Sequence, residues 1–471
     1  MNTIITLVAT AIGVAMLGGC ASFSTDGGFD AVADLTQART GVAPVYQRTS
    51  SEPDTAKSRT AELLQQPLTA DGAVEVALLN NRGLQARFSE LGIAESERVR
   101  AGRLRNPTLG FSRLSEGGGV VEIERSIVFD VLGLLTMPWA KEVERGRFER
   151  AQLQAAHQAV GLAAQTRRAY FAAVAAQELV RYGQQVKEAA DASSELARRM
   201  VQAGNFNKLA QMREQAFHAD ATARLARARH QAVAEREQLA RLLGLAGDPP
   251  GFELPERLPE LPKEPTQPKD AERAAMAQRL DVMMARRSVD STARALGLGK
   301  ATRFINVLEL GHVNKSLSGE PRADGYEIEL QLPLFDFGST GVARAQATYM
   351  QAVHQAAQLA IDARSEVRES YSAYRTAYDL ARLYRDDVIP LRKRISEENL
   401  LRYNGMLISV FELLADSREQ VEGVTGYVEA LRDFWVAQTD LQTALTGASP
   451  RGGPWLRPMS ATSSAGDAAA H

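Results

Sequence analysis

Four glutamates stand out because they form two pairs at matching positions of the chain. Glu122 and Glu124 in the first half correspond to Glu327 and Glu329 in the second half. A single residue separates the two acids of each pair, so an extended chain places both carboxylates on the same face. Carboxylates gathered on one wet face attract cations and repel anions. A face that only has to be polar explains the same residues, and the sequence leaves both interpretations open.

Residue types that perform catalysis or bind metal are not arranged for either task. The six histidines form no pair at metal-ligand spacing, and the sequence contains no cysteine cluster and no calcium-binding loop. A phosphate-binding loop and a Gly-x-Ser-x-Gly motif are also missing. The scattered methionines fit packing better than a copper relay. We therefore expect no enzyme activity, no cofactor and no bound metal.

The composition fits helix packing and argues against nucleic-acid binding. Hydrophobic residues make up 45% of the 471 residues, charged residues 24% and aromatic residues only 6%. Such a chain has few bulky rings to fill a compact core, whereas its alanines suit closely packed helices. The 55 basic and 57 acidic residues give a net charge of −2, and nucleic-acid binding usually requires a basic face.

The first residues resemble the signal sequence of a bacterial lipoprotein. The apolar run Ile4–Leu17 is too short to span a bilayer comfortably and has the length of a signal-peptide core. It leads into Leu17-Gly18-Gly19-Cys20, which resembles a lipobox, where the cysteine is acylated and becomes the new N-terminus.

By that resemblance, residues 1–19 are a signal peptide, Cys20 carries a diacyl or palmitate anchor, and residues 20–67 are a lipid-anchored segment. Cys20 is the only cysteine and has no disulfide partner, which favours this interpretation over an ordinary secretory signal. Ala21 replaces the aspartate that retains such lipoproteins at the inner membrane, so the resemblance implies the outer membrane.

The rest of the chain consists of two copies of one pattern. Phe129-Asp130 recurs as Phe335-Asp336, and Gly204 recurs as Gly405. Ordered landmarks at a nearly constant offset indicate internal duplication. We place the boundaries as follows: first copy 68–247, Pro-rich linker 248–268, second copy 269–447 and a disordered tail 448–471.

Each copy is expected to contain a helix, two strands and two further helices, because proline and glycine interrupt the helical sequence at matching points. The first copy has a helix up to Arg105, strands at 107–116 and 120–129, and helices at 140–202 and 208–243. The second copy has a helix at 270–300, strands at 303–313 and 325–335, and helices at 340–402 and 409–446. The helix 140–202 would extend roughly 95 Å, which suits a rod or tube rather than a compact domain.

The last helix shows how these helices pack. Steps of four and three residues predict a coiled-coil seam along it. The seam positions are Val410, Leu414, Ser417, Val421, Val424, Val428, Leu431, Trp435, Gln438, Gln442 and Leu445.

The strands alternate in the way that is typical of a membrane β-barrel. In 121–129 and 326–334, apolar residues alternate with the glutamates and other polar residues over nearly the length that spans a bilayer. A half-buried strand of a soluble sheet also alternates. Four strands leave open edges that cannot face lipid, so we predict that three copies close a twelve-stranded barrel, continued by a coiled-coil helical barrel. In that trimer the four glutamates would form an acidic lumen ring near one level.

Several segments together resemble the TolC-like outer-membrane efflux family. These are the opening Leu68-Thr69 to Asn81, the junction Arg105-Asn106-Pro107, the second-half Gln278-Arg279-Leu280-Asp281, the strand end Leu332 to Gly338, and the turns Ala203-Gly204-Asn205 and Arg402-Tyr403-Asn404-Gly405. The resemblance covers about Leu68 to Gly447. In the second turn the glycine comes one residue early, and Met406 occupies its usual position.

The resemblance implies a lipid-anchored homotrimer in the outer membrane that acts as a passive export duct. An inner-membrane pump would act on it indirectly, through a periplasmic adaptor protein. The helix–turn–helix tips that contact the adaptor would include Gly204, Asn205, Gly405, Met406 and Leu407. The glycines could equally serve only to reverse the chain.

A periplasmic gate at Glu412 and Asp416 is a further implication, and a solvated helix face is the alternative. The main rival function is a structural periplasmic coiled-coil lipoprotein without transport activity. The sequence does not decide whether the exported substrate is a drug or a metal cation. The acidic strands favour cations.

Overall fold

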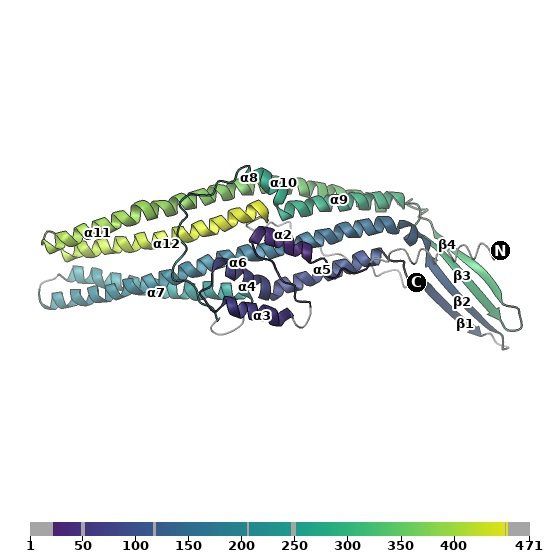
Figure 1. The fold of residues 1–471 in the computed structure, drawn as a ribbon, viewed down its shortest axis with the longest axis horizontal. Helices are drawn as coiled ribbons and strands as arrows, with labels where there is room; N and C mark the ends of the chain where they lie inside the picture. Colours follow the sequence, from purple (N-terminus) through teal and green to yellow (C-terminus); the bar gives the residue numbers. More distant parts are fainter. Residues whose placement is uncertain are drawn as a thin grey trace. The chain divides into compact units, whose positions relative to one another are not determined.

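The computed structural model describes residues 22–48, 52–115, 119–204, 207–245, 251–447 and 449–450 (Figure 1). The chain divides into two compact units. Unit 1 contains residues up to Leu258 together with Leu280–Asp362, and unit 2 contains Pro259–Arg279 together with the chain from Ala363 onward.

Unit 1 combines long helices with the only sheet found in the described residues. Its helices are α2 (Asp30–Thr40), α3 (Glu52–Leu63), α4 (Ala70–Asn80), α5 (Arg82–Ala101), α6 (Val131–Gln202), α7 (Lys208–Leu243), α9 (Leu280–Ala301) and the first part of α10 (Ser339–Leu383). Its strands are β1 (Thr108–Ser115), β2 (Val121–Asp130), β3 (Val307–Leu317) and β4 (Ala323–Gln331). Unit 2 holds α8 (Ala271–Gln278), the rest of α10, the π-helix η1 (Tyr384–Val388), α11 (Ile389–Asn404) and α12 (Val410–Thr446).

The four strands form one antiparallel sheet in the order β1-β2-β3-β4. Each copy of the repeat supplies one hairpin, and the pairing of β2 with β3 joins the two hairpins. β1 and β4 therefore lie at the edges, and neither edge is paired with another strand in the described chain. In unit 1 the sheet continues directly from the ends of the long helices (Figure 1).

Equivalent contacts in the two copies reflect the duplication. Asn81 separates α4 from α5, and its Nδ2 donates to the Leu242 carbonyl at the end of α7 (3.0 Å). Arg279 separates α8 from α9 in the same way, and its Nη1 donates to the Ala444 carbonyl at the end of α12 (3.3 Å). The helices predicted up to Arg105 and at 270–300 are thus each split by one polar residue that ties the break to a later helix.

The long helix expected at 140–202 begins earlier, at Val131, directly after β2. Pro138 lies inside it, although proline removes a helix hydrogen bond. The start is stabilised by Asp130, whose carboxylate accepts a hydrogen bond from the Gly133 N–H (2.7 Å). The equivalent point of the second copy is different, because β4 ends at Gln331 and seven residues precede α10 at Ser339.

Two strand boundaries also differ from the prediction. β3 covers Val307–Leu317 instead of 303–313, because its outer residues pair with Glu122 and Glu124 of β2. β4 stops at Gln331 instead of residue 335, just before Pro333, which has no N–H to donate to a ladder.

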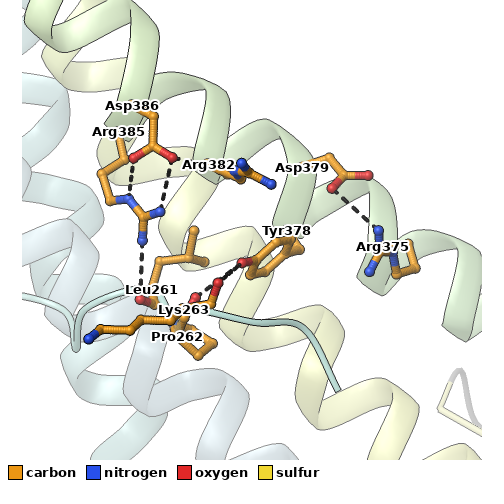
Figure 2. Close-up of polar contacts among 9 residues, drawn as sticks. All are labelled: Leu261, Pro262, Lys263, Arg375, Tyr378, Asp379, Arg382, Arg385 and Asp386. Atoms are coloured by element: carbon orange, nitrogen blue, oxygen red, sulfur yellow. Dashed lines mark hydrogen bonds and ion pairs between the residues drawn. The ribbon is translucent and has the colours of Figure 1, made fainter. Parts of the chain in front are cut away.

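The predicted helix 340–402 is interrupted by η1, where an extra residue widens one turn. In unit 2 the linker lies against this stretch (Figure 2). The Tyr378 hydroxyl donates to the carbonyls of Pro262 (3.2 Å) and Lys263 (2.7 Å), and Arg385 Nη1 donates to the Leu261 carbonyl (3.3 Å). The Arg385 guanidinium also holds the pKa of the Asp386 carboxyl below its usual range. The linker thus fastens its own main chain to the side chains beside η1.

The predicted seam of α12 is only partly the buried stripe. Val428 and Leu431 are buried as expected, but Phe434 is buried in place of Trp435. The Trp435 Nε1 instead donates to the Pro259 carbonyl of the linker (3.0 Å). The side chains at 410, 414 and 417 lie outside those that are described.

Among the described residues, none of the helices offers a stretch both long and apolar enough to cross a membrane.

Candidate functional site

The register of the sheet separates its side chains into two contrasting faces. Residues directly opposite each other in an antiparallel pair point to the same side. One side, which we call the acidic face, carries Thr108, Gly110, Ser112, Leu114, Glu122, Glu124, Ser126, Val128, Asp130, Val307, Glu309, Gly311, Val313, Lys315, Leu317, Ala323, Gly325, Glu327, Glu329 and Gln331. The other side, the apolar face, carries Leu109, Phe111, Arg113, Ser115, Val121, Ile123, Arg125, Ile127, Phe129, Leu308, Leu310, His312, Asn314, Ser316, Asp324, Tyr326, Ile328 and Leu330.

The four glutamates predicted to form a ring share the acidic face but not one level. Glu124 is opposite Lys315, near the hairpin ends of the strands. Glu327 is opposite Gly311, which is opposite Val128. The step from Glu124 to Val128 corresponds to ~13 Å of strand. The prediction that the four glutamates lie near one level was therefore wrong. The register of a sheet is a tertiary property, and the offset between the two copies does not reveal it.

The two levels differ in charge. Lys315 forms an ion pair with Glu122 and lies opposite Glu124, so the outer level is partly neutralised. At the helix-proximal level, Glu309 lies between Asp130 on one side and Glu329 on the other. Within the part of the chain that the structure describes, only Asp130 has an ion-pair partner there, Arg105 at 2.9 Å. Like charges directly opposite each other destabilise a sheet, so this second level is the stronger anionic site.

Sequence reasoning missed Asp130 and Glu309 as members of this group. Asp130 ends β2, and the alternation of β3 is too irregular to assign Glu309 to a face. The pairing of both with known strands is what reveals them. Among the described residues, no group of three or more His, Cys, Asp or Glu side chains is placed to hold a metal ion.

The first helix–turn–helix tip joins α6 to α7. Gly204 adopts a left-handed backbone (φ 78°) and its N–H donates to the Val201 carbonyl (3.0 Å). Asn205 lies outside the described residues. Asn207 begins α7 by accepting a hydrogen bond from the Ala210 N–H (2.8 Å). Gly204 therefore ends α6 in the usual left-handed position.

The second tip joins α11 to α12 and uses a different residue for the same turn. Gly405 keeps an ordinary backbone (φ −79°), whereas Met406 takes the left-handed one (φ 59°). The Leu407 N–H donates to the Arg402 carbonyl (2.8 Å) and the Met406 N–H to the Tyr403 carbonyl (2.9 Å). This pair of bonds is a Schellman motif, which normally has glycine where Met406 stands. Met406 is 92% exposed, so its side chain is free to meet a partner.

The left-handed Met406 should strain the second tip. Met406→Gly removes the side chain that disfavours this backbone, and we expect a gain of about 1 kcal/mol in local stability. Hydrogen exchange of the Leu407 N–H should slow accordingly. Gly405→Ala is the matched control, because a Cβ there would meet only atoms at 3.5 Å or more. Faster exchange in Met406→Gly would contradict the strain.

The two residues proposed for a gate have different environments. Glu412 forms a capping box with Ser409: its carboxylate accepts from the Ser409 N–H (3.1 Å), and the Ser409 hydroxyl accepts from the Glu412 N–H (3.4 Å). Asp416, one turn further, is buried, and its Oδ2 has no hydrogen-bond partner among the described residues. Glu412 thus has a structural task at the start of α12, and Asp416 is the better gate candidate. Cys20 lies outside the described residues.

Comparison with solved structures identifies the fold. The outer-membrane channel OprN superposes with a TM-score of 0.68 at 18% identity, over 88% of this chain and 96% of that chain. CusC, whose structures concern folding and transmembrane channel formation, gives 0.67 at 16% identity, over 80% and 92%. The MtrE outer-membrane channel of Neisseria gonorrhoeae gives 0.61 at 17% identity, over 80% and 89%. The chain has the fold of these channels.

These matches confirm the mainly helical, internally duplicated helix–strand–strand–helix fold expected from the sequence, and with it the TolC-like resemblance at the level of fold. No protein-family model matches the sequence, and no curated protein matches it either.

Proposed function

We propose that this chain is the outer-membrane channel of a tripartite efflux system, a passive duct rather than an enzyme. The observation that carries the proposal is the sheet. It has one apolar and one acidic face, and both of its edge strands are open. Three copies would supply twelve strands, pair every edge and enclose the acidic faces around water.

The other parts of the proposal follow the same fold. The homotrimer would be anchored in the outer membrane through acylated Cys20 and the sheet, and its helices would reach into the periplasm. The tips at Gly204 and Asn205 and at Gly405, Met406 and Leu407 would contact the periplasmic adaptor, which links the duct to the inner-membrane pump. The domain boundaries predicted from the sequence form part of this proposal.

Crosslinking and conductance together test the duct. A variant with one cysteine on each edge strand, for example at Ser112 in β1 and Glu327 in β4, should crosslink neighbouring chains into a trimer and no larger species. Purified trimer should give stepwise conductance in planar lipid bilayers. A folded trimer without conductance would favour the rival, a structural periplasmic coiled-coil lipoprotein.

Radiolabelled palmitate should enter the wild type and be absent from Cys20→Ser.

The acidic face supports cations as the preferred small ions of the duct. Because Glu327 and Glu329 have no ion-pair partner among the described residues, Glu327→Gln with Glu329→Gln should lower the cation-over-anion permeability ratio by about twofold in screened, salt-containing solution. Glu122→Gln with Lys315→Gln is the matched control, and a smaller change is expected because it removes one charge of each sign and leaves the net charge of that level unchanged. Reversal potentials across a salt gradient measure both. Equal, negligible changes would mean that the acids only keep the lumen wet.

A further inference from the structure

An exposed apolar surface crosses the point where β2 becomes α6. On the sheet it comprises the helix-proximal half of the apolar face, where Phe129, Leu310 and Ile328 are exposed. On the helix it continues over Leu134, Leu135 and Trp139. Leu135 and Trp139 are four residues apart and so lie on one side of α6. Exposed apolar side chains gathered in one region mark an interaction surface.

The segment between β4 and α10 extends this surface. Glu329 of β4 pairs with Glu309, which pairs with Asp130, so α6 and the residues after Gln331 leave the sheet at nearly the same level. That segment exposes Leu332, Leu334, Phe335 and Phe337. Its backbone is largely bonded within itself, with the Phe337 N–H on the Pro333 carbonyl (2.8 Å) and the Gly338 N–H on Asp336 (3.0 Å).

A polar row crosses the apolar face at its other end. Arg125 Nη1 donates to the Asn314 side-chain oxygen (3.1 Å), and Asn314 Nδ2 donates to an Asp324 carboxylate oxygen (2.7 Å). Arg125 lies in the middle of β2, between Val121 and Asp130. If the strands alone spanned the bilayer, this arginine would lie near the midplane, where it costs about 2–4 kcal/mol. The row fits the outer edge of the hydrocarbon instead.

Below Trp139 the exposed side chains of α6 change from apolar to basic. Lys141, Arg145, Arg147 and Arg150 are exposed, and two of them, Arg145 and Arg147, also pair with glutamates of the same stretch. Tryptophan next to basic residues is typical of the membrane–water interface, where rings and long cationic side chains meet the headgroups. Near the start of β3, exposed Lys300 and Arg303 repeat this pattern beside exposed Phe304.

The lengths decide between the two placements of the membrane. The strand from Arg125 to Asp130 rises ~17 Å along its axis, or roughly 13 Å of depth at the usual barrel tilt. The helix from Val131 to Trp139 adds about 12 Å. Together they give roughly the 25 Å apolar band of an outer-membrane barrel, which the apolar part of the strands alone does not reach.

We propose that the bilayer is displaced toward the helices, so that the first two turns of α6 and the segment 332–337 are embedded in the phospholipid leaflet nearest the helices. This placement rests on the proposed membrane function. The partner is phospholipid: acyl chains contact Leu134, Leu135 and Phe335, and phosphate groups meet the basic residues beyond Trp139. The Asp130 cap on Gly133 suits this position, because it satisfies a helix-end N–H where water is scarce.

Depth-dependent fluorescence quenching tests the placement in the full chain. Trp435 and Trp455 are replaced by phenylalanine, which leaves Trp139 as the only reporter. The trimer is reconstituted in phosphatidylcholine–phosphatidylglycerol vesicles that carry a nitroxide near the headgroup or near the chain centre. Two further reporters, Ile328→Trp and Val121→Trp, are built on the same background with Trp139→Phe.

We expect Trp139 to lose emission with the headgroup-proximal nitroxide, and Ile328→Trp with the central one. Val121→Trp should lose little with the central one. If the headgroup-proximal nitroxide quenches Val121→Trp and does not quench Trp139, the strands alone span the bilayer. The displacement is then wrong, although the proposed membrane function stands. If Ile328→Trp is not quenched in folded trimer, the membrane function itself fails. Retained helical circular dichroism and trimer size confirm that each variant is folded.

Discussion

Arg279→Met is expected to lower the free energy of unfolding by about 3 kcal/mol. The Arg279 side chain is fully buried (0% exposed), and its Nη2 lies 2.8 Å from a Glu366 carboxylate oxygen. Removing the guanidinium leaves that carboxylate and the Ala444 carbonyl without this donor. Breaking a buried ion pair costs about 3–5 kcal/mol, and we expect the lower end because the Glu366 side chain is 26% exposed and can be rehydrated.

Thermal unfolding of the detergent-solubilised protein, followed by helical circular dichroism, measures this loss. Arg273→Met is the matched control. Its side chain is 87% exposed and pairs with Asp270 only at 4.0 Å, so the change should stay below about 0.5 kcal/mol. Arg279→Met combined with Glu366→Leu should recover much of the loss, because two apolar groups replace both charges. Equal melting temperatures for Arg279→Met and Arg273→Met would show that the buried pair contributes nothing.

The burial of Arg279 could not be predicted from the sequence. The duplication, the long helices and the strand hairpins follow from local signals: proline and glycine breaks, helical periodicity and strict alternation. The burial of an arginine does not, because exposed arginines are the rule and its partners Glu366 and Ala444 are distant in the sequence. Similarity between the copies gives no help either, since Asn81 occupies the corresponding break.

The start of α6 shows a local rule overridden by local structure. Proline normally ends a helix, so the sequence alone predicts that this helix begins after Pro138. The Asp130 cap instead starts the helix at Val131, before the proline. The π-helix at Tyr384–Val388 was missed for a related reason: one extra residue in a turn leaves the surrounding helical pattern intact.

The candidate site was predictable by type but not by position. Alternation placed Glu122, Glu124, Glu327 and Glu329 on one face, and the register agrees. Their heights depend on how β2 pairs with β3, which no local pattern encodes. At the second tip, the early Gly405 and the Met406 in its place were visible in the sequence, whereas the left-handed backbone of Met406 required the structure.

Gly338 lies between β4 and α10, at a position where the structure requires glycine. Gly338 has a left-handed backbone (φ 69°), and a Cβ there would lie 2.1 Å from the Arg303 carbonyl oxygen. The backbone alone costs a non-glycine residue about 1–2 kcal/mol, and overpacking adds about 1–3 kcal/mol. We therefore expect Gly338→Ala to destabilise the protein by about 3 kcal/mol.

Gly341→Ala is the control three residues later. A Cβ there would meet nothing within 4 Å, and alanine is favoured over glycine in a helix by roughly 0.5–1 kcal/mol, so this change should stabilise α10 slightly. Thermal unfolding of the two variants should therefore shift in opposite directions. Opposite shifts from the same substitution three residues apart would locate the requirement in the close approach to Arg303. If Gly338→Ala unfolds like the wild type, the strand-to-helix connection tolerates a shift, and the glycine is not what fixes the level at which α10 leaves the sheet.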